Sequence, residues 1–97
     1  MDIVIVSANG MVKRTSANEY RQQGRGGAGI GAIGLAPGDR VVAVLSLGMA
    51  QSVMIVTAGG TSIRFFASEL RTMGRTAQGV RGIRLKDGDK VVSAAAV

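Results

Sequence analysis

The sequence contains no cysteine and no histidine, and aromatic residues make up only 3% of it. Without cysteine, the chain cannot form disulfides, thiolate metal sites or cysteine nucleophiles. Without histidine, it lacks the commonest general base and metal ligand. With so few aromatic side chains, we do not expect a platform on which the bases of single-stranded nucleic acid could stack. We therefore expect no metal site and no cofactor.

Long apolar runs are also missing. No stretch approaches the roughly 18 apolar residues that a membrane span requires, and the amino terminus does not have the layout of a secretory signal. We expect a cytoplasmic protein without a membrane partner. Ninety-seven residues correspond to one small domain, which buries a modest fraction of its surface and depends on neighbours for stability or is marginal alone.

The chain is strongly basic. Twelve Lys and Arg face six Asp and Glu, which gives a net charge of +6 and a sequence pI of about 11.2. A positive field of this size favours polyanions, with nucleic acid as the first candidate and an anionic membrane as the second. The alternative interpretation is that a basic surface merely keeps a small domain soluble.

The sequence consists of two tandem copies of one unit. At an offset of 50 residues, 2–47 aligns with 52–97 without a gap, and seventeen of the 46 aligned pairs are identical. A repeat of this length is typical of propeller and solenoid architectures. We divide the chain into a first blade repeat (1–47), a linker (48–51) and a second blade repeat (52–97).

Each copy is predicted to form four short strands. Asn9-Gly10 and Gly59-Gly60 are hairpin turn signals, because both positions of such turns tolerate positive φ. A single helical turn is expected at 16–20 and at 66–70, and the side chain of Tyr20 or Leu70 is expected to pack into the core. The expected strands are 3–7, 11–15, 30–35 and 40–47 in the first repeat and 53–57, 61–65, 80–85 and 90–97 in the second.

No segment shows a sustained helical period, so the predicted class is all-β, with two four-stranded antiparallel, propeller-like blades. The phase of the apolar residues in the third strand predicts a bulge at Gly31 or Gly82. Two blades are too few to close a propeller ring, because roughly three repeats or more are usually needed. The expected partners are therefore the remaining blades of a longer parent protein or other copies of this chain.

A glycine-rich loop occupies 22–29 in the first repeat. Gly24, Gly26 and Gly29 satisfy G-x-G-x-x-G, but this pattern indicates dinucleotide binding only where it joins a strand to a helix, and no amphipathic helix follows. We interpret the glycines as a means of bringing backbone N–H groups close to an anion. Arg25 and its counterpart Arg75 would then project from one rim.

Two further arginine pairs recur, Arg14/Arg64 and Arg21/Arg71, so that each blade carries three equivalent cations. For Arg14 and Arg64, an ion pair with Glu19 or Glu69 is an equally good interpretation. The second repeat adds basic residues where the first has Gly31, Gly34 and Ala36, and its net charge is +4 against +2 for the first. We expect the second repeat to contribute more to binding DNA. The candidate DNA-binding residues are Lys13, Arg14, Arg21, Arg25, Arg64, Arg71, Arg75, Arg81, Arg84 and Lys86.

The motifs Gly10-x-x-Lys13-Arg14-Thr15, 18–21 and 23–29, together with 73–85 in the second repeat, resemble a blade of the C-terminal domain of the bacterial DNA gyrase A protein. The corresponding protein of topoisomerase IV carries related blades and is the nearest competitor. The resemblance covers essentially the whole chain.

This resemblance implies a β-pinwheel, a six-bladed disc that binds and wraps double-stranded DNA around a basic rim in support of negative supercoiling. The wrapping motif of the family, Gln-Arg-Arg-Gly-Gly-Lys-Gly, appears here as Gln23, Gly24, Arg25, Gly26, Gly27, Ala28 and Gly29. Because Gly24 and Ala28 replace two basic residues, the loop is either the wrapping motif itself or a degenerate copy from a later blade. We interpret it as the degenerate copy, because the two blades together resemble the last two blades of the domain.

The family's cleavage tyrosine and ATP site have no counterpart in this sequence, so the resemblance implies a non-catalytic, DNA-binding part of an ATP-dependent type II topoisomerase. The implied partners are double-stranded DNA and a gyrase B-type ATPase subunit. The implied location is the bacterial cytoplasm at the nucleoid. The competing hypothesis is a structural module whose blades assemble with other chains, since exposed sheet edges tend to pair.

Overall fold

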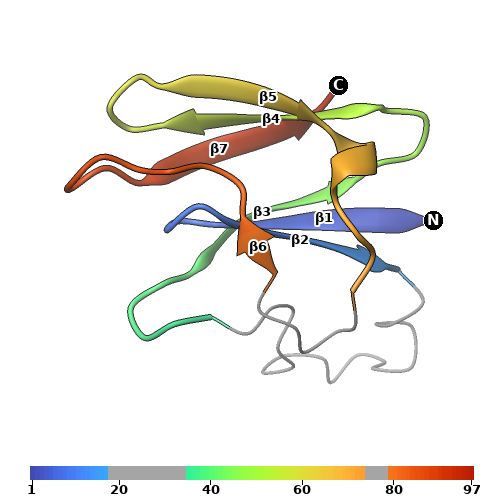
Figure 1. Ribbon diagram of the computed structural model, residues 1–97, viewed down its shortest axis with the longest axis horizontal. Coiled ribbons are helices and arrows are strands. Elements are labelled where there is room, and N and C mark those ends of the chain that lie inside the picture. The colour runs from blue at the N-terminus through green and yellow to red at the C-terminus, as the bar shows by residue number, and fades with distance from the viewer. Residues whose placement is uncertain (18–34, 74–78) are drawn as a thin grey trace.

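The computed structural model describes residues 1–17, 35–73 and 79–97, and these form two antiparallel β-sheets packed face to face (Figure 1). The predicted all-β class with two antiparallel sheets is confirmed. Among the described residues, no helix is long and apolar enough to cross a membrane. The elements are β1 (Asp2–Ser7), β2 (Met11–Ser16), β3 (Val41–Ser46), β4 (Ser52–Thr57), β5 (Ser62–Phe66), the 3-10 turn η2 (Ala67–Glu69), β6 (Val80–Arg81) and β7 (Val91–Ala96).

Each repeat begins with a hairpin, β1–β2 in the first and β4–β5 in the second. Gly10 and Gly60 close the two turns with φ of 90° and 94°, values that a residue with a Cβ rarely adopts. Among the described residues only glycines have positive φ, so Asn9 does not adopt the positive φ that its hairpin signal would have allowed. The predicted hairpins are confirmed, and in each turn only the second position, Gly10 or Gly60, has a positive φ.

Two aspartates fasten these hairpin turns to the last turn of the same repeat. Asp39 Oδ1 accepts the backbone N–H groups of Asn9 and Arg40, at 2.9 and 2.8 Å. Asp89 Oδ1 accepts those of Gly59 and Lys90 in the same way. The identical Asp39/Asp89 pair of the alignment therefore holds identical loop contacts.

The contacts of Asp39 also change its acidity. Partial burial alone would raise the pKa of this carboxyl. Hydrogen bonds from Ser7, Asn9 and Arg40 and the nearby charge of Lys90 lower the pKa by more than burial raises it, so the net pKa lies below the usual value. The pKa of Asp89 is lowered as well, first by a hydrogen bond with the Thr57 side chain. Both residues therefore bind their turns best as carboxylates.

The sheets do not coincide with the sequence repeats. The first sheet has the strand order β3-β1-β2-β6, and its outer strand β6 comes from the second repeat. Met11 pairs with Arg81 and Val12 with Val80. The second sheet contains β5-β4-β7 among the described residues. The prediction of a strand at 80–85 within the second blade is therefore wrong in two respects. The strand covers only Val80–Arg81, and it pairs with β2 of the first repeat, so that it completes the first sheet.

Glycines make this strand exchange sterically possible. Gly79 has φ of +85°, and a Cβ at this position would lie 2.5 Å from the carbonyl oxygen of Val12. A Cβ at Gly82 would overlap Val12 Cγ2. The regular pairing with β2 covers Val80 and Arg81, Gly82 N–H still donates to Gly10 O at 2.8 Å, and no register shift is found where a bulge was considered at Gly82. The register shifts instead between Val6 and Ser7 and between Val56 and Thr57, and Gly31 lies outside the described residues.

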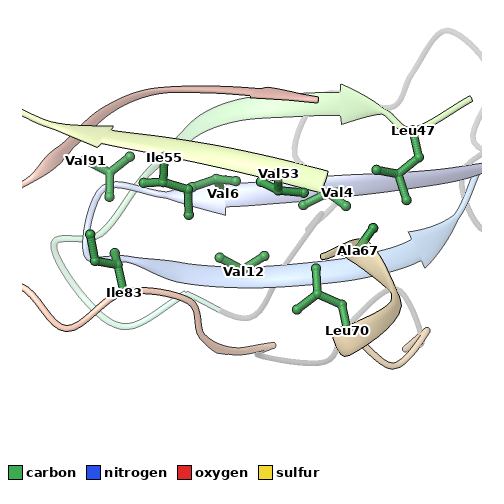
Figure 2. Packing of buried hydrophobic residues seen from close by; sticks show 10 residues of the cluster. All are labelled: Val4, Val6, Val12, Leu47, Val53, Ile55, Ala67, Leu70, Ile83 and Val91. Carbon is green, nitrogen blue, oxygen red and sulfur yellow. The ribbon is translucent and has the colours of Figure 1, made fainter. Parts of the chain in front are cut away.

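The hydrophobic core lies between the two sheets (Figure 2). Val4, Val6 and Val12 of the first sheet face Val53 and Ile55 of the second. The single helical turn predicted at 66–70 is confirmed as η2, and Leu70 beside it is 8% exposed and packs into the core as expected. The remaining buried members are Leu47, Ala67, Ile83 and Val91. Because residues of both repeats supply this core, neither hairpin is independent of the other.

Candidate nucleic-acid interface

Several of the candidate cations fall outside the described residues. These are Arg21, Arg25 and Arg75, and with them the whole loop 23–29 that resembles the wrapping motif. They stay predictions from sequence. The described candidates are Lys13, Arg14, Arg64, Arg71, Arg81, Arg84 and Lys86.

Lys13 is fully buried on the face of the first sheet that carries Ile5 and Thr15. The period of two along β2 explains this placement, because Val12 points into the core between the sheets and Lys13 points to the other side. A phosphate contact by Lys13 would require the side chain to leave this position.

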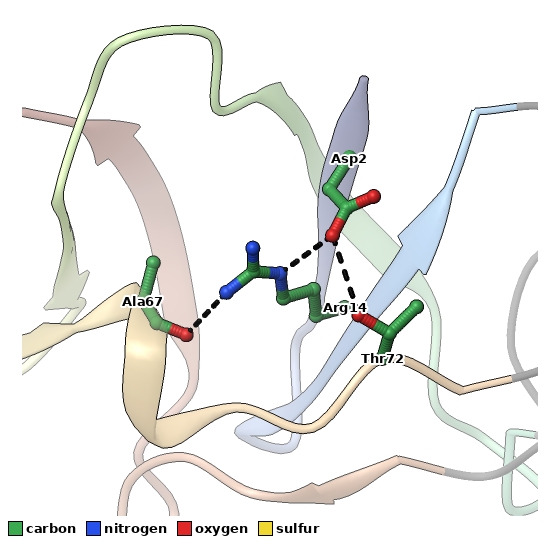
Figure 3. A network of polar contacts seen from close by, with 4 residues as sticks. All are labelled: Asp2, Arg14, Ala67 and Thr72. Carbon is green, nitrogen blue, oxygen red and sulfur yellow. Dashed lines mark hydrogen bonds and ion pairs between the residues drawn. The ribbon is translucent and has the colours of Figure 1, made fainter.

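Arg14 lies at the centre of a polar network between the repeats (Figure 3). Its Nε donates to Asp2 Oδ2 at 2.8 Å, and its Nη1 donates to the backbone carbonyl of Ala67 at 2.8 Å. Thr72 Oγ1 donates to the same Asp2 oxygen at 3.3 Å. The hydrogen bond from Arg14, assisted by its charge, lowers the pKa of Asp2 below the usual value.

Arg14 thus forms an ion pair, but with Asp2 rather than with the Glu69 considered from sequence. The Glu69 carboxylate instead accepts the backbone N–H of Phe66 at 3.0 Å, and Glu19 lies outside the described residues. The pairing of Arg14 with Asp2 could have been predicted from the sequence. Once the β1–β2 hairpin is aligned, Asp2 lies opposite Ser16 and Val4 opposite Arg14, so Asp2 and Arg14 are diagonal neighbours on one face.

Arg64 is exposed and lies on the outer face of the second sheet. Ile63 and Phe65 pack toward the core, so the alternation of β5 turns Arg64 to the opposite side. It makes no ion pair with another described residue. A shallow cavity of about 360 Å³ beside it is lined by Ser52, Arg64, Phe65, Phe66 and Glu69.

Arg81, Arg84 and Lys86 are all exposed, and they follow one another on the segment that leaves β6 and runs toward β7. This segment extends to one end of the molecule (orange, left in Figure 1). Arg71, also exposed, lies between η2 and β6. Three of the cations that distinguish the second repeat from the first are therefore available together at the surface.

A groove of about 360 Å³ borders this segment. Arg81 and Lys86 line it together with Lys90, which was not among the predicted residues and which donates through Nζ to Asn9 Oδ1. Asp39, Asp87 and Asp89 line the same groove. Asp39 and Asp89 are occupied by backbone N–H groups, which offset part of their charge.

This arrangement suits contacts with a phosphate backbone rather than the reading of bases. Exposed Arg and Lys side chains can each approach a phosphate, and such contacts carry no sequence information. Within residues 1–17, 35–73 and 79–97 the only helical element is the three-residue η2, which is too short to act as a recognition helix in a major groove. The same residues contain no cluster of three or more acidic side chains able to hold a metal ion.

Comparison with known proteins gives a consistent result. In sequence, the chain is 49% identical over 45 residues to the DNA gyrase A protein of Lawsonia intracellularis (strain PHE/MN1-00), a match that covers 46% of this chain and 6% of that protein. In structure, it matches the C-terminal domain of a DNA topoisomerase IV with a TM-score of 0.86 and 32% identity, and a DNA gyrase A C-terminal domain with a TM-score of 0.84 and 25% identity.

Both structural matches cover 99% of this chain but only 29% and 31% of the matched chains. The chain therefore spans about three tenths of their length and a small part of the whole gyrase A protein. The family model of the DNA gyrase C-terminal domain, a β-propeller, matches residues 2–47 and 51–97. This chain belongs to the family of DNA gyrase C-terminal, β-propeller domains.

Proposed function

We propose that this chain binds double-stranded DNA without sequence preference, as part of the C-terminal domain of a gyrase A-type protein. The observation that carries the proposal is the exposed run of Arg81, Arg84 and Lys86 on the segment 81–86, which starts at the last residue of β6. These three cations lie within a chain of net charge +6, so the field around the segment favours a polyanion.

The proposed surface includes Lys90, which borders the same groove, and Arg71. Arg21, Arg25 and Arg75 belong to it on the sequence alone. Arg14 is occupied by Asp2 and Ala67, and we assign it to the packing of the repeats rather than to DNA.

In the parent protein we propose a supporting role in DNA wrapping and negative supercoiling. The strand-cleaving and ATP-hydrolysing steps would belong to other parts of the enzyme, including a gyrase B-type ATPase subunit. The chain itself would be non-catalytic and would act in the bacterial cytoplasm. Membership of the gyrase C-terminal family supports this proposal.

The test is fluorescence anisotropy of the 97-residue chain with two labelled duplexes of unrelated sequence. Each neutralised phosphate contributes about −0.9 to the slope of log K against log salt, so contact with roughly three to six phosphates gives a slope of about −3 to −5. Equal affinity for both duplexes is expected. Binding that does not respond to salt, or no binding at low salt, contradicts the proposal.

A pair of matched variants locates the surface. Arg84→Ala removes one exposed cation from the proposed surface and should make the slope less steep by about one. Arg64→Ala removes one exposed cation from the outer face of the second sheet and should leave the slope unchanged.

A further inference from the structure

The first hairpin turn contains a reactive pair of residues, Asn9 and Gly10. The backbone nitrogen that follows an asparagine can attack the side-chain amide carbon, because the two atoms belong to adjacent groups and close a small ring. A glycine at the following position has no Cβ to hinder this attack. The turn of the second repeat has Gly59 and Gly60 instead, so only the first of the two turns carries an amide that can react.

The structure places a cation on the amide that would be attacked. Asn9 is partly buried, and its Oδ1 accepts a hydrogen bond from Lys90 Nζ at 2.5 Å. Attack at Asn9 Cγ moves an electron pair onto Oδ1, and an ammonium held at hydrogen-bond distance stabilises the negative charge that develops there. The backbone N–H of Lys90 is bound by Asp89 Oδ1 at 2.9 Å, so the residue that supplies this ammonium is anchored beside the turn.

A backbone hydrogen bond restrains the attacking nitrogen. Gly10 N–H donates to Ser7 O at 3.0 Å, and the nitrogen must leave this bond before it can lose its proton. The bond lies in the turn itself, and a turn opens locally at a lower free-energy cost than the whole domain. On either side of it, β1 and β2 stay paired. The reaction therefore does not require the chain to unfold.

We propose that Asn9 deamidates spontaneously in the folded chain and that the ammonium of Lys90 promotes the reaction. The Gly10 nitrogen loses its proton to solvent and forms a bond to Asn9 Cγ. The Cγ–Nδ2 bond then breaks, and solvent returns a proton to the departing nitrogen, which leaves as ammonia. Water opens the ring at Cγ to give aspartate, or at the Asn9 backbone carbonyl carbon to give isoaspartate. One amide and one water thus become one carboxylic acid and one ammonia, without oxidation or reduction.

The product places a new carboxylate in the groove that Asn9 lines together with Arg81, Lys86 and Lys90. This carboxylate forms an ion pair with Lys90, where the amide only accepts a hydrogen bond, and it lowers the net charge of +6 by one. The consequence for DNA rests on the proposed function. The deamidated chain should bind duplex DNA more weakly, because a cation beside the phosphates is neutralised.

The test follows the masses of tryptic peptides after incubation of the folded 97-residue chain at mildly alkaline pH. Trypsin releases Asn9 in peptide 1–13 and the other asparagine, Asn18, in peptide 15–21. Asn18 precedes Glu19, whose side chain hinders the attack, so peptide 15–21 is an internal control. Peptide 1–13 should gain the mass of an amide-to-acid conversion while peptide 15–21 keeps its mass. An unchanged peptide 1–13, over a time in which the chain unfolded in urea converts, overturns the proposal.

Replacing Lys90 tests the role of its ammonium. In the folded chain, Lys90→Met should slow the conversion by roughly three- to tenfold, because a hydrogen bond from a charged donor to the developing anion is lost at a partly exposed site. Lys90→Arg keeps a charged donor and should retain most of the rate. In urea, where the contact with Asn9 is absent, all three chains should convert equally fast. A folded Lys90→Met variant that converts as fast as the parent chain, or faster, contradicts the role of Lys90.

Anisotropy with duplex DNA separates this inference from the proposed function. After the same incubation, the chain with Asn9 should lose affinity, whereas Asn9→Gly, which copies the turn of the second repeat and carries no amide, should keep it. Equal affinities of the two incubated chains, with peptide 1–13 converted, would refute the effect of the new carboxylate. If neither chain binds DNA before incubation, the proposed function fails, and the peptide masses still decide whether Asn9 deamidates.

Discussion

Replacing Gly79 by alanine tests whether β6 truly lies against the hairpin of the other repeat. A Cβ at this position would lie 2.5 Å from Val12 O and 3.0 Å from its carbonyl carbon. These are backbone atoms in the middle of the first sheet and cannot rotate away. The variant must therefore displace β6, which would weaken the β2–β6 pairing and the bond from Gly82 N–H to Gly10 O.

Two contributions set the size of the effect. A residue with a Cβ at positive φ costs about 1–2 kcal/mol, and forcing an extra carbon into a packed site costs about 1–3 kcal/mol. We expect Gly79→Ala to lower the free energy of unfolding by about 3 kcal/mol. At about 4–8 °C per kcal/mol for a chain of this size, the melting temperature falls by roughly 12–24 °C.

Gly88→Ala is the matched control. Its φ of +79° is close to that of Gly79, but nothing lies within 4 Å of the added Cβ. It should lower the free energy of unfolding by only about 1–2 kcal/mol. Urea denaturation followed by circular dichroism measures both variants at the same pH. Equal losses in the two variants would refute the strand exchange, because the close approach to Val12 would then be absent.

Three further predictions test other parts of the structure. Gly82→Ala should destabilise the chain less in a Val12→Ala background than alone, because the Val12 Cγ2 that the new Cβ would overlap is gone. A double-mutant cycle measured by urea denaturation should give a coupling free energy of about 1 kcal/mol. Additive effects of the two substitutions on the free energy of unfolding would contradict the contact. Arg14→Met should lower the free energy of unfolding by about 2 kcal/mol through loss of the bonds to Asp2 and Ala67, whereas Arg71→Met, at an exposed site, should leave it nearly unchanged. Because the folded pKa of Asp39 is lowered, its stabilising effect is present above the unfolded value of about 3.9 and is lost as the pH falls through the folded pKa. Asp39→Asn should therefore flatten the fall in stability between about pH 5 and pH 2, and an unchanged pH profile would argue against the turn contact.

The local elements of this fold could be predicted from the sequence. Gly10 and Gly60 marked both hairpins, and the alignment at an offset of 50 located the turns that Asp39 and Asp89 fasten. Leu70 was correctly expected in the core. These features depend on residues close together in the chain, for which turn chemistry and apolar patterning are sufficient signals.

The partner of β6 could not be predicted in the same way. A short strand of Val80 and Arg81 pairs equally well with any open sheet edge, and the repeat itself suggested that each copy would fold as its own blade. The choice depends on the close approach of Gly79 and Gly82 to Val12, a contact between distant residues. Arg14 shows the same limit, since its carbonyl acceptor at Ala67 lies 53 residues away.

The candidate site was predicted unevenly for the same reason. Charge and repeat position identified Arg81, Arg84 and Lys86, which are exposed. They did not distinguish these residues from Lys13, which the alternation of β2 places on a covered face. Exposure depends on which face another segment covers, and net charge contains no information about that.

The most direct test of DNA binding by the segment 81–86 is the salt dependence of duplex affinity in the triple variant Arg81→Ala, Arg84→Ala, Lys86→Ala. If each side chain neutralises one phosphate, the slope of log K against log salt becomes less steep by about 2 to 3, and the affinity at low salt falls for every duplex sequence. Circular dichroism should show the fold intact, because all three residues are exposed. A folded triple variant whose affinity and slope equal those of the unmodified chain would contradict the proposed surface.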